Sequence, residues 1–308
     1  MRIDDLAPTA ADAVRQASGY LTDYFTPTVR VGVTGLSRAG KTVFITALVR
    51  ALVSGGRLPF FSAQAQGRID SAFLEPQPDD AVPRFDYEAH LAALGRDPPE
   101  WPEGTRSISE LRVTIAFKPE SRLWRALGTS RLHVDIVDYP GEWLVDLALL
   151  DRDYARWSDE ALAQAGNARR ASAAAPFLAF VDGLAAVGQL DEQTAIAGAR
   201  AFTDYLATAR AADNAQATMT PGRFLMPGDL AGSPLLTFFP LPAALRDSAS
   251  AAAFAGLLAR RFESYKTHVV RPFFRDHFSR LDRQIVLVDA LGALNAGPEA
   301  MAELEAAL

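Results

Sequence analysis

One stretch of the chain has the residue types and spacing needed to hold a phosphate chain. The run Gly35-Leu36-Ser37-Arg38-Ala39-Gly40-Lys41-Thr42 fits the pattern G-x-x-x-x-G-K-[ST], with an apolar strand expected before it and a helix after it. The two glycines let the backbone turn tightly, so that successive N–H groups face phosphate oxygens. The first turn of the following helix adds partial positive charge. We expect these residues, together with Val43, to bind the phosphates of a nucleotide.

Individual side chains in and after this run have separate roles. Lys41 would place its ammonium between the β- and γ-phosphates, and the Thr42 hydroxyl is suited to coordinate Mg²⁺. Asp138 ends a second apolar strand and begins the pattern D-x-x-G, which closes at Gly141. Such an acid holds Mg²⁺ through its water shell, and the glycine can donate its N–H to the γ-phosphate. The alternative interpretation is an ordinary strand–turn–helix with a surface lysine and an accidental D-x-x-G.

The composition argues against several other kinds of site. The chain has no cysteine, which removes disulfides, thiol catalysis and Cys-based metal sites. Its 31 basic and 37 acidic side chains give a net charge of −6, which argues against a nucleic-acid partner. The four histidines have no metal-binding spacing; they are His90, His133, His268 and His277. With 49% hydrophobic residues, the composition is that of a soluble globular protein.

Neither a secretory signal nor a membrane span is expected. Residues 1–5 contain two acids, and no apolar h-region follows them. The longest uncharged stretch, residues 230–245, is interrupted by glycine and prolines and is shorter than the roughly 20 apolar residues that a spanning helix needs. We therefore expect a cytoplasmic protein that is not itself transmembrane.

The elements around these motifs alternate in the manner of an α/β fold. Strands at 111–117 and 132–136 alternate apolar and polar residues, and only about 14 residues separate them, so they predict an antiparallel pair. Further strands are expected at 30–34 and 284–289, and helices at 10–25, at 41–54 and after Pro298. The sequence thus predicts a mostly parallel sheet of P-loop type with an antiparallel edge pair.

The domain division follows from these elements. Residues 1–29 are expected to form an N-terminal helix, and residues 30–142 the first part of the P-loop domain. Within that part, residues 55–104 are rich in proline and are expected to be irregular, apart from a short helix at 87–94. Residues 143–281 are mostly helical, with a break near Pro176 and a kink at Pro272. Residues 282–308 return to the P-loop domain.

Long segments beyond the P-loop resemble one known family. Residues 30–46, 138–143, 221–229, 265–277 and 282–297 are similar to the YcjX-like family of bacterial P-loop GTPases, whose core is similar to Ras-like and Gα proteins. The resemblance implies GTP or GDP with Mg²⁺ as ligands and a regulatory role in a stress response. It also implies a protein partner for the helical insertion or the switch segments. A membrane protein is one candidate partner, which would bring the chain to the inner membrane.

The similarity to Gα proteins suggests a switch I threonine. Thr105 takes the place of the threonine that meets Mg²⁺ and the γ-phosphate in those proteins, and the alternative is a plain loop threonine before a strand. Gα proteins carry an arginine three residues earlier, where this chain has Pro102. Arg106 and Arg38 are the candidates to replace it.

The residue after Gly141 also departs from the pattern. Ras-like and Gα proteins use a glutamine there to orient water, and this chain has Glu142. A carboxylate near a γ-phosphate is repelled unless it is protonated or paired. We therefore expect Gly141 and Glu142 to sense the γ-phosphate, and intrinsic hydrolysis to be slow, at about 10⁻⁴ to 10⁻² per second.

A guanine-reading N/T-K-x-D motif is absent from the sequence. Lys118 is followed by Pro-Glu-Ser and Lys266 by Thr-His-Val, and in the YcjX-like family the motif lies beyond the strand at 284–289. We therefore expect the chain to be truncated before its base pocket. Three functions stay open: a GTP-hydrolysing switch, an ATPase or small-molecule kinase, and a non-catalytic partner-binding scaffold with a vestigial P-loop.

Overall fold

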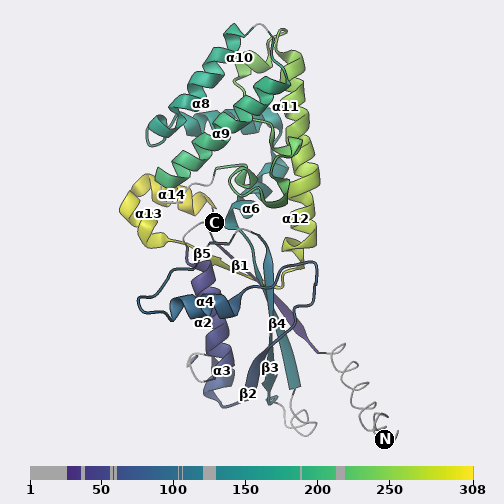
Figure 1. Ribbon diagram of the computed structural model, residues 1–308, viewed down its shortest axis with the longest axis vertical. Helices are drawn as coiled ribbons and strands as arrows, with labels where there is room; N and C mark the ends of the chain where they lie inside the picture. The colour runs from purple at the N-terminus through teal and green to yellow at the C-terminus, as the bar shows by residue number, and fades with distance from the viewer. Residues whose placement is uncertain are drawn as a thin grey trace, which may run out of the picture.

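The computed structural model describes most of the chain from residue 26 onward (Figure 1). The described ranges are 26–35, 39–55, 58, 61–102, 104–105, 107–120, 130–187, 189–212 and 219–307. The helix expected at 10–25 lies outside them. So do Leu36, Ser37 and Arg38 of the glycine-rich run, and Arg106.

A five-stranded mixed sheet forms the base of the described structure, in the order β2-β3-β4-β1-β5. The strands are β1 (Thr28–Gly35), β2 (Ile69–Glu75), β3 (Ser109–Phe117), β4 (Ser130–Asp138) and β5 (Arg283–Leu287). Strand β1 is parallel to both of its neighbours, β4 and β5, whereas β3 is antiparallel to β2 and β4. Because β3 alone runs opposite to the others, the predicted mostly parallel α/β sheet and its antiparallel pair are confirmed, but the pair does not lie at the edge, since β2 follows β3.

The sheet extends one strand further than the sequence predicts. Strand β2 lies in the 55–104 segment, where only irregular structure and one short helix were expected, so that part of the prediction is wrong. It pairs with β3 alone at the edge of the sheet, and none of its residues is fully buried. Its sequence places two polar residues, Asp70 and Ser71, before three apolar ones at 72–74, so it lacks the alternation that marks a strand and the pattern was missed. The same segment holds α3 (Ser62–Ala65) and the expected helix α4 (Tyr87–Leu94).

Helix α2 (Lys41–Val53) packs against the sheet. Its buried face repeats at helical spacing through Ile45, Val49 and Leu52. This face packs in one hydrophobic cluster with Val33 of β1 and with residues of β3 and β4. The first turn of α2 is therefore held at the edge of the sheet where β1 and β4 end.

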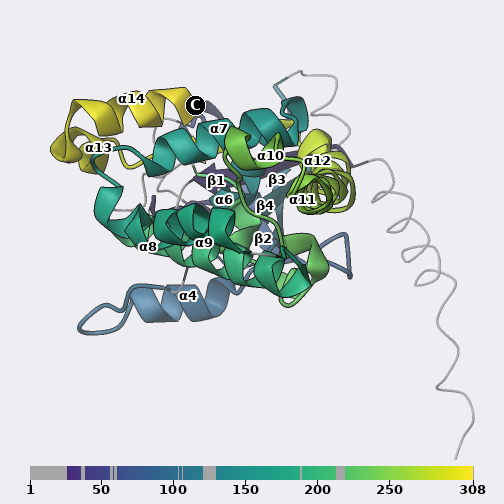
Figure 2. The same ribbon diagram turned by 90° about the horizontal axis from the view of Figure 1, so that it is seen from above.

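The elements between β4 and β5 are helical. They are α6 (Gly141–Val145), η1 (Asp146–Asp151), α7 (Tyr154–Ala165), α8 (Ala171–Gly183), η2 (Leu184–Ala186), α9 (Glu192–Ala212), η3 (Gly222–Phe224), η4 (Gly228–Leu230), η5 (Pro234–Leu236), α10 (Ala243–Arg246), α11 (Ala252–Tyr265), η6 (Lys266–Val270), α12 (Arg271–Asp276) and η7 (Phe278–Arg280). Helices α8 to α11 lie at the opposite end of the molecule from β2 and β3 (Figure 1). Helices α8 and α9 pack side by side (Figure 2). After β5 come α13 (Ala290–Ala296), which the sequence did not predict, and α14 (Pro298–Ala307).

Two prolines affect these helices differently. The break expected near Pro176 is wrong, because α8 continues through this residue. The missing N–H costs one backbone hydrogen bond, and the neighbouring alanines are strong helix formers. At Pro272 the helix is irregular, since the π-helical turn η6 separates α11 from α12. None of the helices in the described ranges has the length and apolar character needed to cross a membrane.

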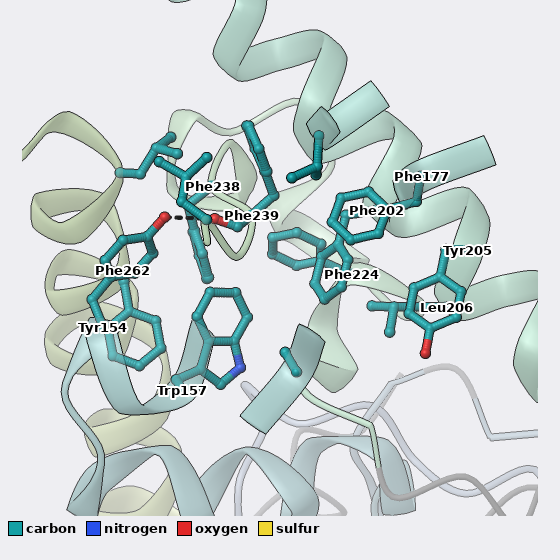
Figure 3. Packing of buried hydrophobic residues seen from close by; sticks show 14 of the residues in the cluster. Tyr154, Trp157, Phe177, Phe202, Tyr205, Leu206, Phe224, Phe238, Phe239 and Phe262 are labelled. Atoms are coloured by element: carbon teal, nitrogen blue, oxygen red, sulfur yellow. Dashed lines mark hydrogen bonds between the residues drawn. The ribbon is translucent and has the colours of Figure 1, made fainter. Parts of the chain in front are cut away.

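The helical region has a core of its own, built largely from aromatic rings (Figure 3). Trp157 stacks on Phe262 at 5.1 Å between ring centroids and meets the edge of Phe238 at 5.4 Å. The Tyr154 hydroxyl donates a hydrogen bond of 2.7 Å to the carbonyl oxygen of Phe239, drawn in Figure 3. A smaller cluster that includes Val137, Tyr139, Trp143 and Phe273 joins this region to the sheet. Helix α6, which contains Trp143, therefore lies where the two parts of the molecule meet.

Candidate functional site

A cavity of about 210 Å³ lies at the edge of the sheet where β1 and β4 end. Its lining consists of Ala39, Gly40, Lys41, Thr42, Val43, Trp101, Pro102, Gly104, Thr105, Glu142 and Met226. The structure thus brings together the start of α2, the loop before β3 and the residue that follows Gly141. The sequence did not predict the contributions of Trp101, Gly104 and Met226.

Both glycines of the phosphate-binding pattern are required by the backbone. Gly40 has a φ of 82°, in the left-handed region that glycine adopts without strain. At Gly35 a Cβ atom would lie 2.4 Å from the carbonyl oxygen of Leu287 in β5. Only a residue without a side chain allows β1 and the end of β5 to approach this closely.

Lys41 lies over the loop that precedes it. Its side-chain Nζ donates a hydrogen bond of 2.9 Å to the carbonyl oxygen of Gly35. Burial lowers the pKa of this lysine, while the carboxylates of Glu142 and Asp138 raise it and the charge of Arg210 lowers it. The ammonium therefore lies between the loop and two carboxylates, in a position from which it can reach an anion in the cavity.

Asp138 and Thr105 are joined across the site. The Thr105 hydroxyl donates a hydrogen bond of 2.7 Å to Oδ2 of Asp138, although 33 residues separate them. Burial raises the pKa of Asp138 to about 6, and the Thr105 hydrogen bond and the Lys41 charge act against this rise. The other oxygen, Oδ1, is buried and accepts no hydrogen bond from any residue that the structure describes.

These oxygens suit a small, hard cation. Mg²⁺ prefers carboxylate and hydroxyl oxygens and usually takes only one or two ligands from the protein. Asp138, which is bonded to Thr105, offers a buried oxygen with unused acceptor capacity, and Thr42 and Thr105 line the cavity and offer hydroxyls. The residues present therefore fit the metal that a nucleotide triphosphate brings.

Glu142 is paired with an arginine that the sequence did not indicate. The Arg210 guanidinium donates through Nη2 to Oε1 of Glu142, 68 residues away. The Glu142 side chain is 9% exposed and that of Arg210 is 19% exposed. Arg210 lies in the last turn of α9, where a basic residue reads as an ordinary partner for the helix dipole. No local pattern could have distinguished it.

The segment around Gly222 packs directly against α6. A Cβ atom at Gly222 would lie 1.8 Å from the carbonyl oxygen of Glu142. The Trp143 indole N–H donates a hydrogen bond of 3.1 Å to the carbonyl oxygen of Met226, and the Arg223 guanidinium lies 3.2 Å from the centroid of the Trp143 ring. Residues 222–226 therefore hold α6 from the side of the helical region.

Asp146, which directly follows α6, also holds the segment around Gly222. Its Oδ1 accepts a hydrogen bond of 2.7 Å from the Gly222 N–H, and its Oδ2 accepts bonds from the Arg223 N–H at 3.2 Å and the Tyr265 hydroxyl at 2.5 Å. Burial raises the pKa of Asp146 to about 6, and these hydrogen bonds act against the rise. The network ties η1 to two other parts of the helical region.

Two polar residues of the sheet region, Asp289 and His133, have structural roles. Asp289 caps α13 by accepting a hydrogen bond of 2.8 Å from the Gly292 N–H. His133 is buried on β4, with its Nδ1 at 2.8 Å from the Thr114 hydroxyl. Neither residue lines the cavity.

The strand–glycine loop–helix unit and the acid on the parallel neighbouring strand define a P-loop α/β fold. The chain belongs to the YcjX-like family, DUF463, which it matches over residues 29–308.

Two relatives are similar to most of the chain. It is 42% identical to the Ras-like GTPase YcjX of Escherichia coli strain K12 over 290 residues, which cover 91% of this chain and 62% of the relative. It is 36% identical to the Ras-like GTPase YcjX of Shewanella oneidensis over 299 residues, which cover 91% of this chain and 61% of that relative. The chain thus spans about three fifths of the length of these relatives.

Proposed function

We propose that this chain binds a guanine nucleotide with Mg²⁺ and acts as a switch that hydrolyses GTP slowly. One observation carries the proposal: Lys41, Thr42 and Thr105 line one cavity, and Asp138 accepts the hydrogen bond of Thr105 and acts on the charge of Lys41, so that residues of three separate segments lie together. The names of the two relatives, both Ras-like GTPases, support guanine over adenine.

The chain's own groups account for phosphate binding. Lys41 exchanges its bond to the Gly35 carbonyl for the β- and γ-phosphate oxygens, while the N–H groups at the start of α2 face the same cavity. Thr42, Thr105 and Asp138 hold Mg²⁺, which neutralises charge on the phosphate oxygens when it is bound. Gly141 donates its N–H to the γ-phosphate, so that α6 takes up a different position when this phosphate is lost.

The cellular role rests on the family resemblance. We place the switch in a cytoplasmic stress response, with a protein partner on the helical region or the switch segments. A membrane protein is one candidate, and such a partner would recruit the chain to the membrane surface.

Calorimetric titration with GDP, GTPγS and ADP, each with and without Mg²⁺, tests the proposal. We expect binding of both guanine nucleotides, tighter with Mg²⁺, and its loss in Lys41→Ala. Lys118→Ala is the matched control, because this lysine is exposed, follows the end of β3 that is remote from Asp138, and pairs with Asp70. Preference for ADP would favour an ATPase or kinase, and no binding would favour a scaffold. Lys41→Ala that binds as well as the wild type would overturn the P-loop assignment.

Single-turnover hydrolysis tests the slow rate. We expect about 10⁻⁴ to 10⁻² per second without a partner, the range of unassisted GTPases. A rate above roughly one per second in the isolated chain would contradict it.

A further inference from the structure

The ion pair between Arg210 and Glu142 is not explained by stability. Both side chains are largely buried, and the pair joins the last turn of α9 to the first turn of α6. Removing two charges from water costs about as much as their attraction returns, so well-packed apolar residues often stabilise a protein equally well. A buried pair at the edge of a phosphate site therefore calls for a chemical role.

The position of Arg210 suggests what that role is. Glu142 lines the cavity, and the charges of Glu142 and Arg210 both act on Lys41. The guanidinium is thus separated from the cavity by a single carboxylate. Among the described residues that line the cavity, Lys41 is the one cation, and Pro102 occupies the place of the Gα arginine. A second positive charge could therefore act at this site, and Arg210 is a nearby side chain that carries one.

We propose that Arg210 is the charge-stabilising arginine of the hydrolysis reaction, supplied by α9 and held on Glu142 until a nucleotide triphosphate enters. This inference rests on the proposed function, and its substrate is a nucleoside triphosphate.

The reaction defines what the arginine stabilises. The oxygen of water forms a bond to the γ-phosphorus, while the bond from that phosphorus to the β–γ bridging oxygen breaks. The electron pair of the broken bond leaves with the nucleoside diphosphate. One proton of the water stays on the attacking oxygen, and the other passes to another oxygen of the phosphate released. Negative charge grows on the bridging oxygen, where a guanidinium is worth far more than in the ground state.

The same arginine removes the difficulty posed by Glu142. A carboxylate alone would be repelled by the γ-phosphate. Arginine has five N–H donors in a planar fork, so it can bond phosphate oxygens on one edge and keep Glu142 on another. The pair therefore allows an acid to remain beside the phosphate, with the helical region completing the site.

Single-turnover GTP hydrolysis by Arg210→Ala and Arg210→Lys tests this role, together with GDP binding in the presence and absence of AlF₄⁻. We expect GDP affinity to stay within about threefold of the wild type, because the arginine acts in the transition state. Hydrolysis should fall about 20- to 30-fold, the ratio between GTPases with and without an arginine in cis. The tightening of GDP binding by AlF₄⁻ should be lost in Arg210→Ala and only partly kept in Arg210→Lys.

Arg200→Ala is the matched control, since Arg200 is exposed on the same helix and should leave every value unchanged. If Arg210→Ala does not fold, Arg210→Lys and Arg210→Gln, which keep the side-chain stem, carry the test. A wild-type rate and wild-type AlF₄⁻ response in these variants overturn the inference alone. A wild-type chain that binds no GDP overturns the proposed function and the inference with it.

Discussion

Two buried aspartates, one in each part of the molecule, have the same pKa and opposite surroundings. Asp138 at the end of β4 and Asp146 at the start of η1 both have a pKa raised to about 6 by burial. Asp146 uses both oxygens to accept three hydrogen bonds from the protein. Asp138 accepts one from Thr105, and its second oxygen has no partner in the part of the chain that the structure describes. Burial alone therefore does not separate the two acids, whereas unused bonding capacity does, and that capacity is what we expect of a metal ligand.

The hydrophobic cores of the two parts of the molecule also differ, since one is mainly aliphatic and the other is largely aromatic. Aliphatic residues such as Val33, Ile45 and Val49 pack under the cavity and hold β1 and α2 together. The helical region is built around Trp157 and its ring contacts, which need particular angles as well as volume. One core lies beneath the candidate site, and the other holds the helices together through ring contacts.

Truncating the aromatic core should give the largest loss. Trp157→Ala removes the ring that joins Phe238 to Phe262 and the indole hydrogen bond of 3.0 Å to Thr220, so we expect the free energy of unfolding to fall by about 3–5 kcal/mol. Urea unfolding followed by circular dichroism measures this. Ile45→Val in the sheet core is the comparison and should cost about 0.5–1.5 kcal/mol. Equal losses in the two variants would contradict the difference between the cores.

The pH dependence of stability should reveal both acids. Their pKa is raised from 3.8 to about 6 on folding, so the folded chain binds more protons than the unfolded chain between these values. The free energy of unfolding should therefore fall as pH rises from about 4 to 6, by up to about 3 kcal/mol for each group. Urea unfolding in metal-free buffer at several pH values checks the sign. Asp138→Asn should show a smaller fall than the wild type, and an unchanged fall would count against the assignment.

Asparagine should separate the two acids at pH 7.5. Asp138→Asn removes a desolvated charge while its carbonyl still accepts from Thr105, so the nucleotide-free chain should gain up to about 2 kcal/mol. Asp146→Asn turns an N–H₂ group toward existing donors and should lose about 2 kcal/mol. Thermal unfolding without Mg²⁺ measures both. A change in the same direction for the two variants would remove the distinction between a complete network and an open site.

The smallest expected effect tests the contact between the two parts. Gly222→Ala places a methyl group against the Glu142 backbone and should cost about 1–2 kcal/mol. Gly256→Ala is the matched control, because no atom lies within 4 Å of the added Cβ and the residue is in the interior of α11. This variant should be up to about 1 kcal/mol more stable. Thermal unfolding of the pair decides the point, and equal midpoints would show that residues 222–226 do not hold α6.

The features that the sequence predicted are those encoded by neighbours in the chain. The glycine-rich run lies between β1 and α2 as expected, because Gly35, Gly40 and the apolar spacing of α2 are local signals. The antiparallel pair of β3 and β4 followed from alternation. The edge strand β2 was missed because its residues do not alternate, with polar Asp70 and Ser71 followed by the apolar run at 72–74.

The partner of Glu142 could not be predicted from local sequence signals. The sequence required a carboxylate beside a phosphate to be protonated or paired, but nothing within α9 distinguishes Arg210 from the exposed Arg200. Arg210 and Glu142 are 68 residues apart, and only the tertiary structure brings Arg210 to α6. Met226 is also brought to the cavity by tertiary packing, because residues 222–226 pack on α6.

Trp143 makes the chain its own optical reporter. Its indole lies under the Arg223 guanidinium and is bonded to Met226, which also lines the cavity, as does Glu142, the neighbour of Trp143. A cation over the ring and a hydrogen bond at the indole nitrogen both affect its emission, so a shift of α6 changes the fluorescence. Trp157 lies deep in the aromatic core, whereas Trp101 lines the cavity itself, so the emission of Trp101 should respond to a ligand together with that of Trp143. The occupancy of the cavity can thus be followed by light, without a label.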